Sequence, residues 1–178
     1  ASIVVDELDG LLSIAEKARK IEDVVEADPI RSESRALASM VAEAVDAVEL
    51  DTGSVEVDVP SDVELTVSPT VFRFVVTELV DNALRHNDDP AVTVTWDHHS
   101  NAVVVSDTGS GISDHETEVF ERGHETPLQH GSGLGLWLVK WGVDRFGGSV
   151  AFEVDENGSR VAVSIPSELV SREPTDTQ

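Results

Sequence analysis

The chain has 178 residues, of which 40% are hydrophobic, enough for one domain of ordinary size with a packed core. Its formal net charge of −23 repels nucleic-acid phosphates and anionic lipids, so we expect no nucleic-acid partner and no direct membrane contact. Cys is absent, which excludes disulfides and thiolate chemistry, and no apolar run reaches the ~18–20 residues of a membrane span, so we expect a cytoplasmic domain.

Two helices are expected at the start of the chain. In residues 6–26, apolar side chains recur at steps of three and four, which predicts a helix with a narrow apolar stripe suited to packing on a partner helix. The stripe consists of Leu8, Leu11, Ala15, Ala18, Ile21 and Val25. An ordinary surface helix is the alternative interpretation. Asp28-Pro29 ends this segment, because Pro disfavours the α conformation in the residue before it, and a second helix is expected over about residues 32–49.

Strands and two further helices are expected in the rest of the chain. Pro69 opens a long helical segment that continues to His86, and residues 134–146 form another helical pattern. Alternating runs rich in Val predict strands at residues 55–59, 63–67, 91–96, 102–106, 149–154 and 160–165. The expected organisation is a helical segment at 1–28, a domain at 29–167 and a polar tail at 168–178.

The tetrapeptide Asp-Thr-Gly-Ser occurs twice, at residues 51–54 and 107–110, as an aspartic protease with one catalytic carboxylate in each lobe would require. Such a protease is mostly strand and places its two Asp loops at equivalent points. Here Asp51 follows a predicted helix, whereas Asp107 follows a predicted strand. The protease interpretation is therefore rejected, and the first copy is expected to be a helix-to-strand turn.

Glycine is concentrated between residues 109 and 135, where six of the 12 glycines lie. Gly lets a ligand approach the backbone closely. The segment HGSGLGLWLVK runs from glycines directly into a predicted helix, whose N–H groups and positive end favour an anion such as phosphate. The spacing matches neither the dinucleotide fingerprint nor the P-loop, and a plain glycine-rich turn would explain this segment taken alone.

Four segments taken together resemble a known family. In order and spacing, ELVDNALRH (78–86), DTGSGI (107–112), VFERG (119–123) and GSGLGL (131–136) resemble the N, G1, F and G2 boxes of the GHKL ATP-binding fold. The resemblance covers about residues 30–166 and is closest to the catalytic ATP-binding domain of sensor histidine kinases. It implies an α+β fold: a two-layer α/β sandwich of Bergerat type, with a mixed sheet of about five strands and three helices on one face.

The charge pattern adds a second resemblance. The acidic residues are dispersed along the chain and only three residues are Lys, a composition typical of proteins from a high-salt cytoplasm, where salt screens the self-repulsion. The sequence is in this respect similar to haloarchaeal members of the family.

The resemblance implies a site for ATP and Mg²⁺. Glu78 would be the catalytic residue that polarises the attacking group or a metal-bound water, with a capping or exposed helix acid as the alternative. Asn82, on the same helix face, would give Mg²⁺ one oxygen ligand. Asp107 would accept a hydrogen bond from the adenine amino group and would thus bind nucleotide rather than act as an acid–base catalyst. The other expected nucleotide-binding residues are Arg85, His86, Gly109, Gly111, Ile112, Arg122, Gly131, Ser132, Gly133, Leu134, Gly135 and Leu136.

Four neighbouring residues carry weaker expectations. Thr108 would hold a water near the base, and Phe120 would pack at the base of a lid over residues 113–135. Trp137 and Trp141 are expected in the core or in helix packing rather than stacked on the base.

A phosphoacceptor His is missing from the chain. The pattern H-E-x-x-x-P does not occur, because His115-Glu116 has no Pro at the right distance and His124-Glu125 lies in the glycine-flanked lid. The expected function is the ATP-binding catalytic domain of a two-component sensor histidine kinase that phosphorylates a His outside this chain. The resemblance implies that residues 1–28 are a helical remnant of the dimerisation and phosphoacceptor hairpin, with a separate small kinase that never had an acceptor as the alternative. The expected partners are the acceptor hairpin of the same kinase, homodimeric when full length, and a response regulator. An anti-sigma-factor-like serine kinase and a non-catalytic ATP-sensing module remain as alternatives.

Overall fold

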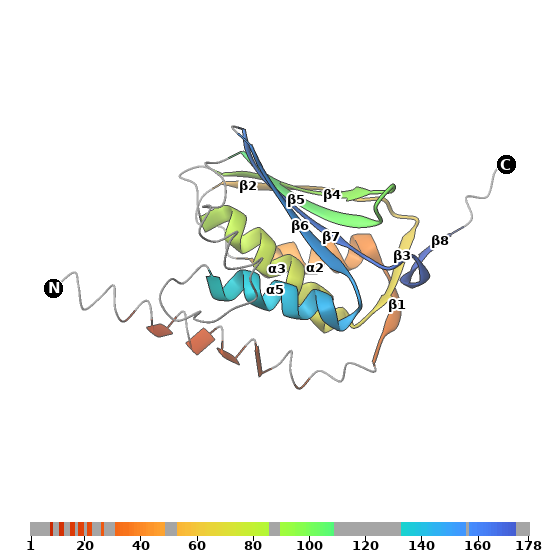
Figure 1. Ribbon diagram of the computed structural model, residues 1–178, viewed down its shortest axis with the longest axis horizontal. Coiled ribbons are helices and arrows are strands. Elements are labelled where there is room, and N and C mark those ends of the chain that lie inside the picture. Colours follow the sequence, from red (N-terminus) through yellow and green to blue (C-terminus); the bar gives the residue numbers. More distant parts are fainter. Residues whose placement is uncertain are drawn as a thin grey trace.

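A computed structural model describes residues 31–48, 53–85, 90–108, 133–155 and 157–173, together with ten residues between Leu8 and Glu26 that are all helical. In this part of the chain, three helices cover one face of a five-stranded mixed sheet, and a three-stranded sheet lies at one end (Figure 1). The expected α+β sandwich is confirmed.

The five-stranded sheet has the order β2-β4-β5-β7-β6. Its strands are β2 (Ser54–Asp58), β4 (Ala91–Asp97), β5 (Ala102–Asp107), β6 (Ser149–Asp155) and β7 (Gly158–Ser164). β2 and β4 are parallel, and the other neighbours are antiparallel. In β4, Val92, Val94 and Trp96 are buried at every second position, as a strand with one face on a core requires. By the strand order, β5 is the central strand of the sheet.

The helices are α2 (Leu37–Asp46), α3 (Pro69–Arg85) and α5 (Gly133–Arg145). α3 begins with Pro, whose fixed φ suits the first helical position, and the backbone N–H of Phe72 donates to the Ser68 carbonyl at 3.0 Å. This helix packs against both α2 and α5 and also contacts β4 and β5. An unusually long run of its residues is consequently buried, from Phe74 to Val80.

The three-stranded sheet has the order β1-β3-β8, with β1 at Glu33–Ala36, β3 at Val63–Val67 and β8 at Val170–Arg172. Two expectations were wrong here. The second helix begins at Leu37 rather than near residue 32, because residues 33–36 pair with β3. Part of the expected tail instead forms a short 3-10 helix, Ser167–Leu169, and β8, which also pairs with β3.

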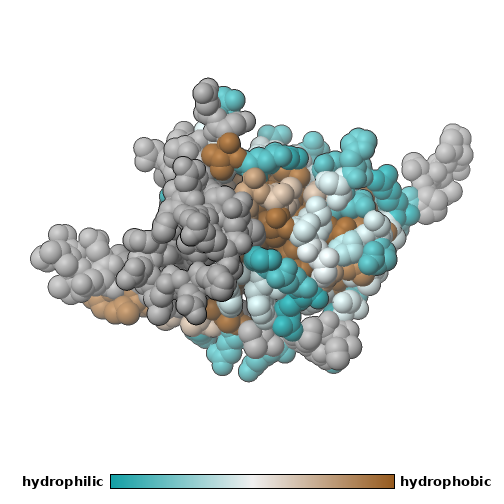
Figure 2. Space-filling model, viewed as in Figure 1, coloured by the Kyte–Doolittle hydropathy of each residue, from teal (hydrophilic) through white to brown (hydrophobic). Residues whose placement is uncertain are grey.

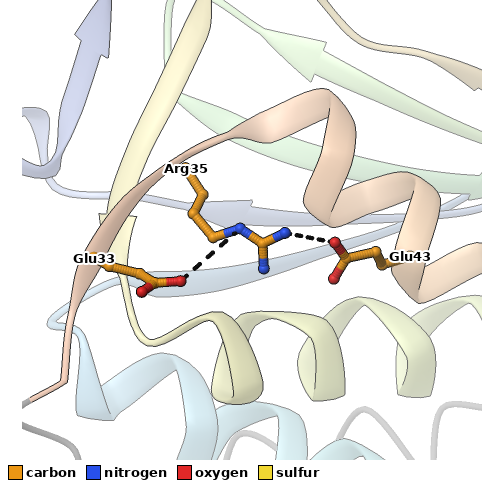
Figure 3. A network of polar contacts seen from close by, with 3 residues as sticks. All are labelled: Glu33, Arg35 and Glu43. Atoms are coloured by element: carbon orange, nitrogen blue, oxygen red, sulfur yellow. Dashed lines mark hydrogen bonds and ion pairs between the residues drawn. The ribbon is translucent and has the colours of Figure 1, made fainter.

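An exposed ion-pair network ties β1 to α2. One Arg35 Nη atom lies 2.5 Å from Glu43 Oε1, and Arg35 Nε lies 3.9 Å from Glu33 Oε1 (Figure 3). The hydrogen bond to Glu43 and the negative charge of that carboxylate raise the pKa of Arg35 above its usual value. Because exposed pairs of this kind contribute only ~0–1 kcal/mol, the network orients the short strand more than it stabilises the fold.

The described N-terminal residues contact the domain through Ile21. This side chain packs against a small apolar cluster on α3 and α5 formed by Val71, Phe74 and Leu138. Three leucines of the predicted apolar stripe or beside it are more than half exposed: Leu8, Leu11 and Leu12. On the face shown in Figure 2, hydrophobic and hydrophilic residues both reach the surface of the described region. No helix among the described residues has the length and apolar character needed to cross a membrane.

Candidate functional site

Three elements bring candidate residues to the same end of the molecule. Asp107, the last residue of β5, pairs with Val92 near the start of β4. β4 follows the C-terminal end of α3, so Asp107 lies at the end of the domain where α3 finishes. The start of α5 lies at this end as well (Figure 1). One end of the domain thus gathers three segments that are distant in sequence: 78–85, 107–108 and 133–136.

Asp107 is held by the last hairpin of the sheet. The Ser159 hydroxyl, on β7, donates a hydrogen bond to Asp107 Oδ2, and Ser159 is buried with 7% of its surface exposed. A carboxylate has about four lone-pair positions, so one bond from Ser159 does not by itself exclude a further donor. The arrangement fixes the direction of the carboxylate at the centre of the sheet.

Gly158 explains how β7 can approach this carboxylate residue so closely. Its φ of +147° is one that residues with a side chain rarely adopt, and a Cβ at this position would lie 1.8 Å from the Asp107 carbonyl oxygen. β7 also begins at Gly158 rather than at the expected residue 160, and Gly158 pairs with Asp155. Only Gly fits at this position.

Glu78 lies on α3 with only 4% of its surface exposed. It faces the start of α5, where a Cβ placed on Gly135 would lie 3.2 Å from Glu78 Oε2. The neighbouring Thr77 is also buried, and its hydroxyl donates to the Ala44 carbonyl of α2 at 3.2 Å. Glu78 is therefore a buried carboxylate between packed helices, not the exposed helix acid that was the alternative.

Asn82 and Arg85 follow Glu78 along α3. Asn82 is half-buried one turn after Glu78. Arg85 is more exposed, and its Nε atom lies 3.0 Å from Asp81 Oδ2 in an i,i+4 ion pair. The guanidinium has five N–H donors, so pairing Nε with Asp81 does not exclude an anion as a second partner. The proposed contact of Arg85 with phosphate stays a prediction.

Several expected site residues lie outside the described residues: His86, Gly109, Gly111, Ile112, Phe120, Arg122, Gly131 and Ser132. Gly133 and Leu134 begin α5, and Leu136 is buried in the main core. Thr108 is exposed directly after Asp107.

The two Trp residues of α5 differ. Trp141 packs beside the cluster that receives Ile21, and the Arg145 guanidinium lies 4.6 Å from its ring centroid. Trp137 is 47% exposed, so the expectation of a core position was wrong for this residue. It lies one turn before the partly buried Trp141 on the same helix.

Ser159 and Gly158 are the site residues that sequence reasoning missed. Both lie between the two strands expected at residues 149–154 and 160–165. Their contact with Asp107 spans 52 residues and depends on β7 pairing with β5, which no local pattern indicates. The available signal was a Gly followed by a small hydroxyl residue at the start of a strand.

Oxygen ligands are present, but no protein cage for a metal is formed by the described residues. They contain no group of three or more His, Asp or Glu side chains that could hold a metal ion. Mg²⁺ is usually bound through one or two protein oxygens, with substrate phosphates and waters completing its octahedron. The half-buried Asn82 amide fits that mode.

The family follows from these features and from sequence comparison. A profile of histidine kinase-, DNA gyrase B- and HSP90-like ATPases matches residues 68–169, more than half of the chain. The chain belongs to this family. Membership supports ATP binding, and the matched range contains Glu78, Asn82, Asp107, Gly135 and Ser159.

Curated relatives include two bacterial sensor proteins. EvgS of Escherichia coli O157:H7 is 30% identical over 118 residues, which cover 60% of this chain and 10% of that protein. SrrB of Staphylococcus aureus (strain NCTC 8325 / PS 47) is 34% identical over 85 residues, which cover 43% of this chain and 15% of that protein. The chain therefore spans only a small part of the length of the curated relatives it matches.

Solved structures share the fold. The Mycobacterial sensor histidine kinase MprB superimposes with a TM-score of 0.63 and 23% identity, over 76% of this chain and 97% of that one. The Acinetobacter baumannii histidine kinase AdeS gives a TM-score of 0.66 and 16% identity, over 90% and 80% of the two chains. The fold is that of the ATP-binding catalytic domain of sensor histidine kinases.

Proposed function

We propose that this chain binds Mg-ATP and acts as the catalytic domain of a two-component sensor histidine kinase, transferring the γ-phosphoryl group to a His outside the chain. The observation that carries the proposal is the meeting of Asp107, Glu78 and Gly135 at one end of a domain of this family. Such a reaction needs a carboxylate that can bind adenine, a carboxylate near the transferred phosphate and a helix start that can hold phosphate. Asp107, Glu78 and the start of α5 at Gly135 can supply these three parts.

Asp107 binds the adenine end of the nucleotide. Its carboxylate accepts a hydrogen bond from the adenine amino group, a donor that guanine lacks at the equivalent position. The Ser159 hydroxyl supports this role because it fixes the carboxylate before nucleotide arrives. A preorganised acceptor loses less freedom on binding, which favours affinity.

The phosphate end lies between α3 and the start of α5. The first-turn N–H groups of α5 attract phosphate oxygens through the positive end of the helix. Asn82 contributes one oxygen to Mg²⁺, which when bound neutralises charge on the phosphates. Arg85, which is exposed and paired with Asp81 through Nε, meets a phosphate oxygen with its remaining donors.

Glu78 acts on the attacking side of the transfer. Phosphoryl transfer depends mostly on positioning and charge neutralisation, so the task of this residue is to orient the attacking nitrogen or a metal-bound water. Its burial between α3 and α5 supports that task, since a carboxylate with little freedom holds its direction.

The partners proposed are the acceptor-bearing helical hairpin of the same kinase and a response regulator, in a cytoplasm of high salt. The exposed Leu8, Leu11 and Leu12 support the first partner, because such side chains on one helix favour packing on another helix. The charge of −23 supports the high-salt setting.

A labelling experiment tests the reaction class. Incubated alone with γ-labelled ATP, the chain should form no acid-labile phosphohistidine. With a cognate hairpin that carries an acceptor His, it should label the hairpin, slowly because the acceptor is untethered and lacks an effective concentration in the millimolar range. Acid-stable phosphoserine on a protein substrate would favour the serine kinase instead, and ATP binding without transfer would favour the sensing module.

A pair of variants tests the division of roles on α3. Asn82→Ala should remove the Mg²⁺-dependent part of ATP affinity, measured by calorimetry with and without Mg²⁺. Glu78→Ala should largely keep ATP affinity and lose transfer to the hairpin. If both variants gave the same binding curve, the proposed division between metal ligand and catalytic carboxylate would be wrong.

A further inference from the structure

α5 approaches α3 at two glycines that lie on the same side of the helix. A Cβ at Gly142 would lie 2.8 Å from Val75 Cγ2, and a Cβ at Gly135 would lie 3.2 Å from Glu78 Oε2. The two positions are seven residues apart, which is close to two helical turns. α5 therefore lies against α3 through two positions without side chains.

The two contacts differ in chemistry. Gly142 meets aliphatic side chains, Val75 and Val71, so its role is ordinary close packing. Gly135 is the third residue of α5 and meets a carboxylate oxygen of a residue that is 96% buried, given its exposed fraction of 4%. The first turn of a helix carries N–H groups without helical partners and a partial positive charge, which stabilise a nearby carboxylate.

We propose that Gly135 is a positioning residue for Glu78, and this inference rests on the proposed function. The missing side chain at Gly135 leaves the space in which the Glu78 carboxylate lies against the first turn of α5. The same turn is the proposed phosphate site. Gly135 thereby sets the distance between the catalytic carboxylate and the phosphates, a role separate from letting the nucleotide approach the loop backbone.

The geometry predicts what a side chain at residue 135 does. A contact of 3.2 Å is tighter than nine in ten real Cβ contacts, so the Glu78 carboxylate must move by a few tenths of an ångström. A misplacement of about 1 Å can slow catalysis by about a hundredfold, so this smaller shift should slow transfer by about severalfold.

A thermal double-mutant cycle tests the contact without any nucleotide. Gly135→Ala should lower the thermal midpoint when Glu78 is present. In a Glu78→Ala background the same substitution should raise the midpoint, because Ala is the better helix former once the contact is gone. Gly142→Ala is the matched control and should shift the midpoint equally in both backgrounds. An equal shift for Gly135→Ala in both backgrounds would overturn the proposal.

Folding failure of the single variant is also informative. If Gly135→Ala does not fold, the double variant Glu78→Ala/Gly135→Ala should fold, since the carboxylate that obstructs the new methyl group is removed. A double variant that fails to fold as well would overturn the inference.

Measurements of the transfer rate and of ATP affinity distinguish a residue that positions Glu78 from one that binds phosphate directly. Gly135→Ala should slow transfer to the hairpin by more than it weakens ATP binding. Loss of ATP affinity to the same degree with Glu or with Ala at residue 78 would assign Gly135 to the phosphate loop instead. If wild-type chain bound no ATP, the proposed function would fail, while the thermal cycle would still decide whether Gly135 seats Glu78.

Discussion

The two Asp-Thr-Gly-Ser copies occupy unlike positions in the same sheet. The first leads into β2, an edge strand: Gly53 has φ +87°, and the Ser54 N–H donates to the Pro90 carbonyl at 3.0 Å. The second copy begins at the end of β5, the central strand, where Asp107 accepts a hydrogen bond from the Ser159 hydroxyl. One tetrapeptide thus stands between a helix and a strand in one place, and in the other it supplies the carboxylate that we propose binds adenine.

The difference comes from the neighbouring strands rather than from the peptide. An edge strand has one neighbouring strand, and the described residues of the first copy, Gly53 and Ser54, lie beside Pro90 and Ala91. A central strand has two neighbouring strands, and one of them, β7, supplies the Ser159 hydroxyl that hydrogen-bonds to Asp107. A short motif therefore predicts a local conformation, while its chemistry depends on what the sheet places beside it.

The largest expected effect comes from adding a methyl group at Gly53, within the first copy, or at Gly158, which contacts the second. In Gly158→Ala the Cβ would lie 1.8 Å from the Asp107 carbonyl, and in Gly53→Ala 2.5 Å from the Pro90 carbonyl. Backbone strain alone costs ~1–3 kcal/mol, so both should unfold at lower temperature. Only Gly158→Ala should also weaken ATP binding by the folded protein. Gly147→Ala, with φ +75° and its nearest contact at 3.8 Å, is the control for strain without collision.

The next effect separates the two aspartates. Asp107→Ala should weaken ATP binding about tenfold or more, because losing a hydrogen bond to a charged acceptor costs ~1.5–3 kcal/mol. Asp51→Ala, the matched control, should leave the dissociation constant unchanged. Calorimetry on both variants decides this, and equal losses would mean that the comparison between the copies is wrong.

A smaller effect concerns salt and the edge strand. β2 carries the exposed acids Glu56 and Asp58, and the net charge of −23 makes self-repulsion strong in dilute buffer. The Debye length falls from roughly 30 Å at 0.01 M salt to roughly 3 Å at 1 M. Thermal midpoints should rise from dilute buffer to molar KCl, and amide exchange should slow more in β2 than in β5. A flat or falling midpoint would contradict the high-salt proposal.

The smallest effect concerns Asp97, at the opposite end of the β4–β5 hairpin from Asp107. The Ser100 hydroxyl donates to Asp97 Oδ2 at 2.7 Å and the His99 N–H to Oδ1 at 2.9 Å, and these bonds lower the pKa of Asp97. Its contribution to stability is therefore present above the pKa of the unfolded chain and is lost as pH falls through the lower folded value. An NMR titration should find a midpoint below the usual ~3.9, raised again in Ser100→Ala. A midpoint unchanged by Ser100→Ala would exclude this cause.

Local patterns predicted the elements that pack on the core. α3 and the β4–β5 hairpin were found because their periodicity is long and their turns lie between adjacent strands. β1 and β8 were missed because each is short and polar and exists only through pairing with β3. A residue such as Glu33 carries no sign of that pairing.

The same limit applies to the site. Glu78 and Asp107 were identified because they stand in motifs that can be compared along the sequence. The contacts that orient them, from Gly135 and Ser159, depend on helix packing and strand order. Sequence therefore predicted the chemical groups, and the fold determines which neighbours hold them.

Nucleotide selectivity of the unmodified chain tests the central claim most directly. In calorimetric titrations with Mg²⁺, ATP and ADP should bind and GTP should bind at least about tenfold more weakly, because Asp107 accepts a hydrogen bond that guanine cannot donate. Equal affinity for ATP and GTP, or binding of neither, would contradict the assignment of the second Asp-Thr-Gly-Ser copy to adenine recognition.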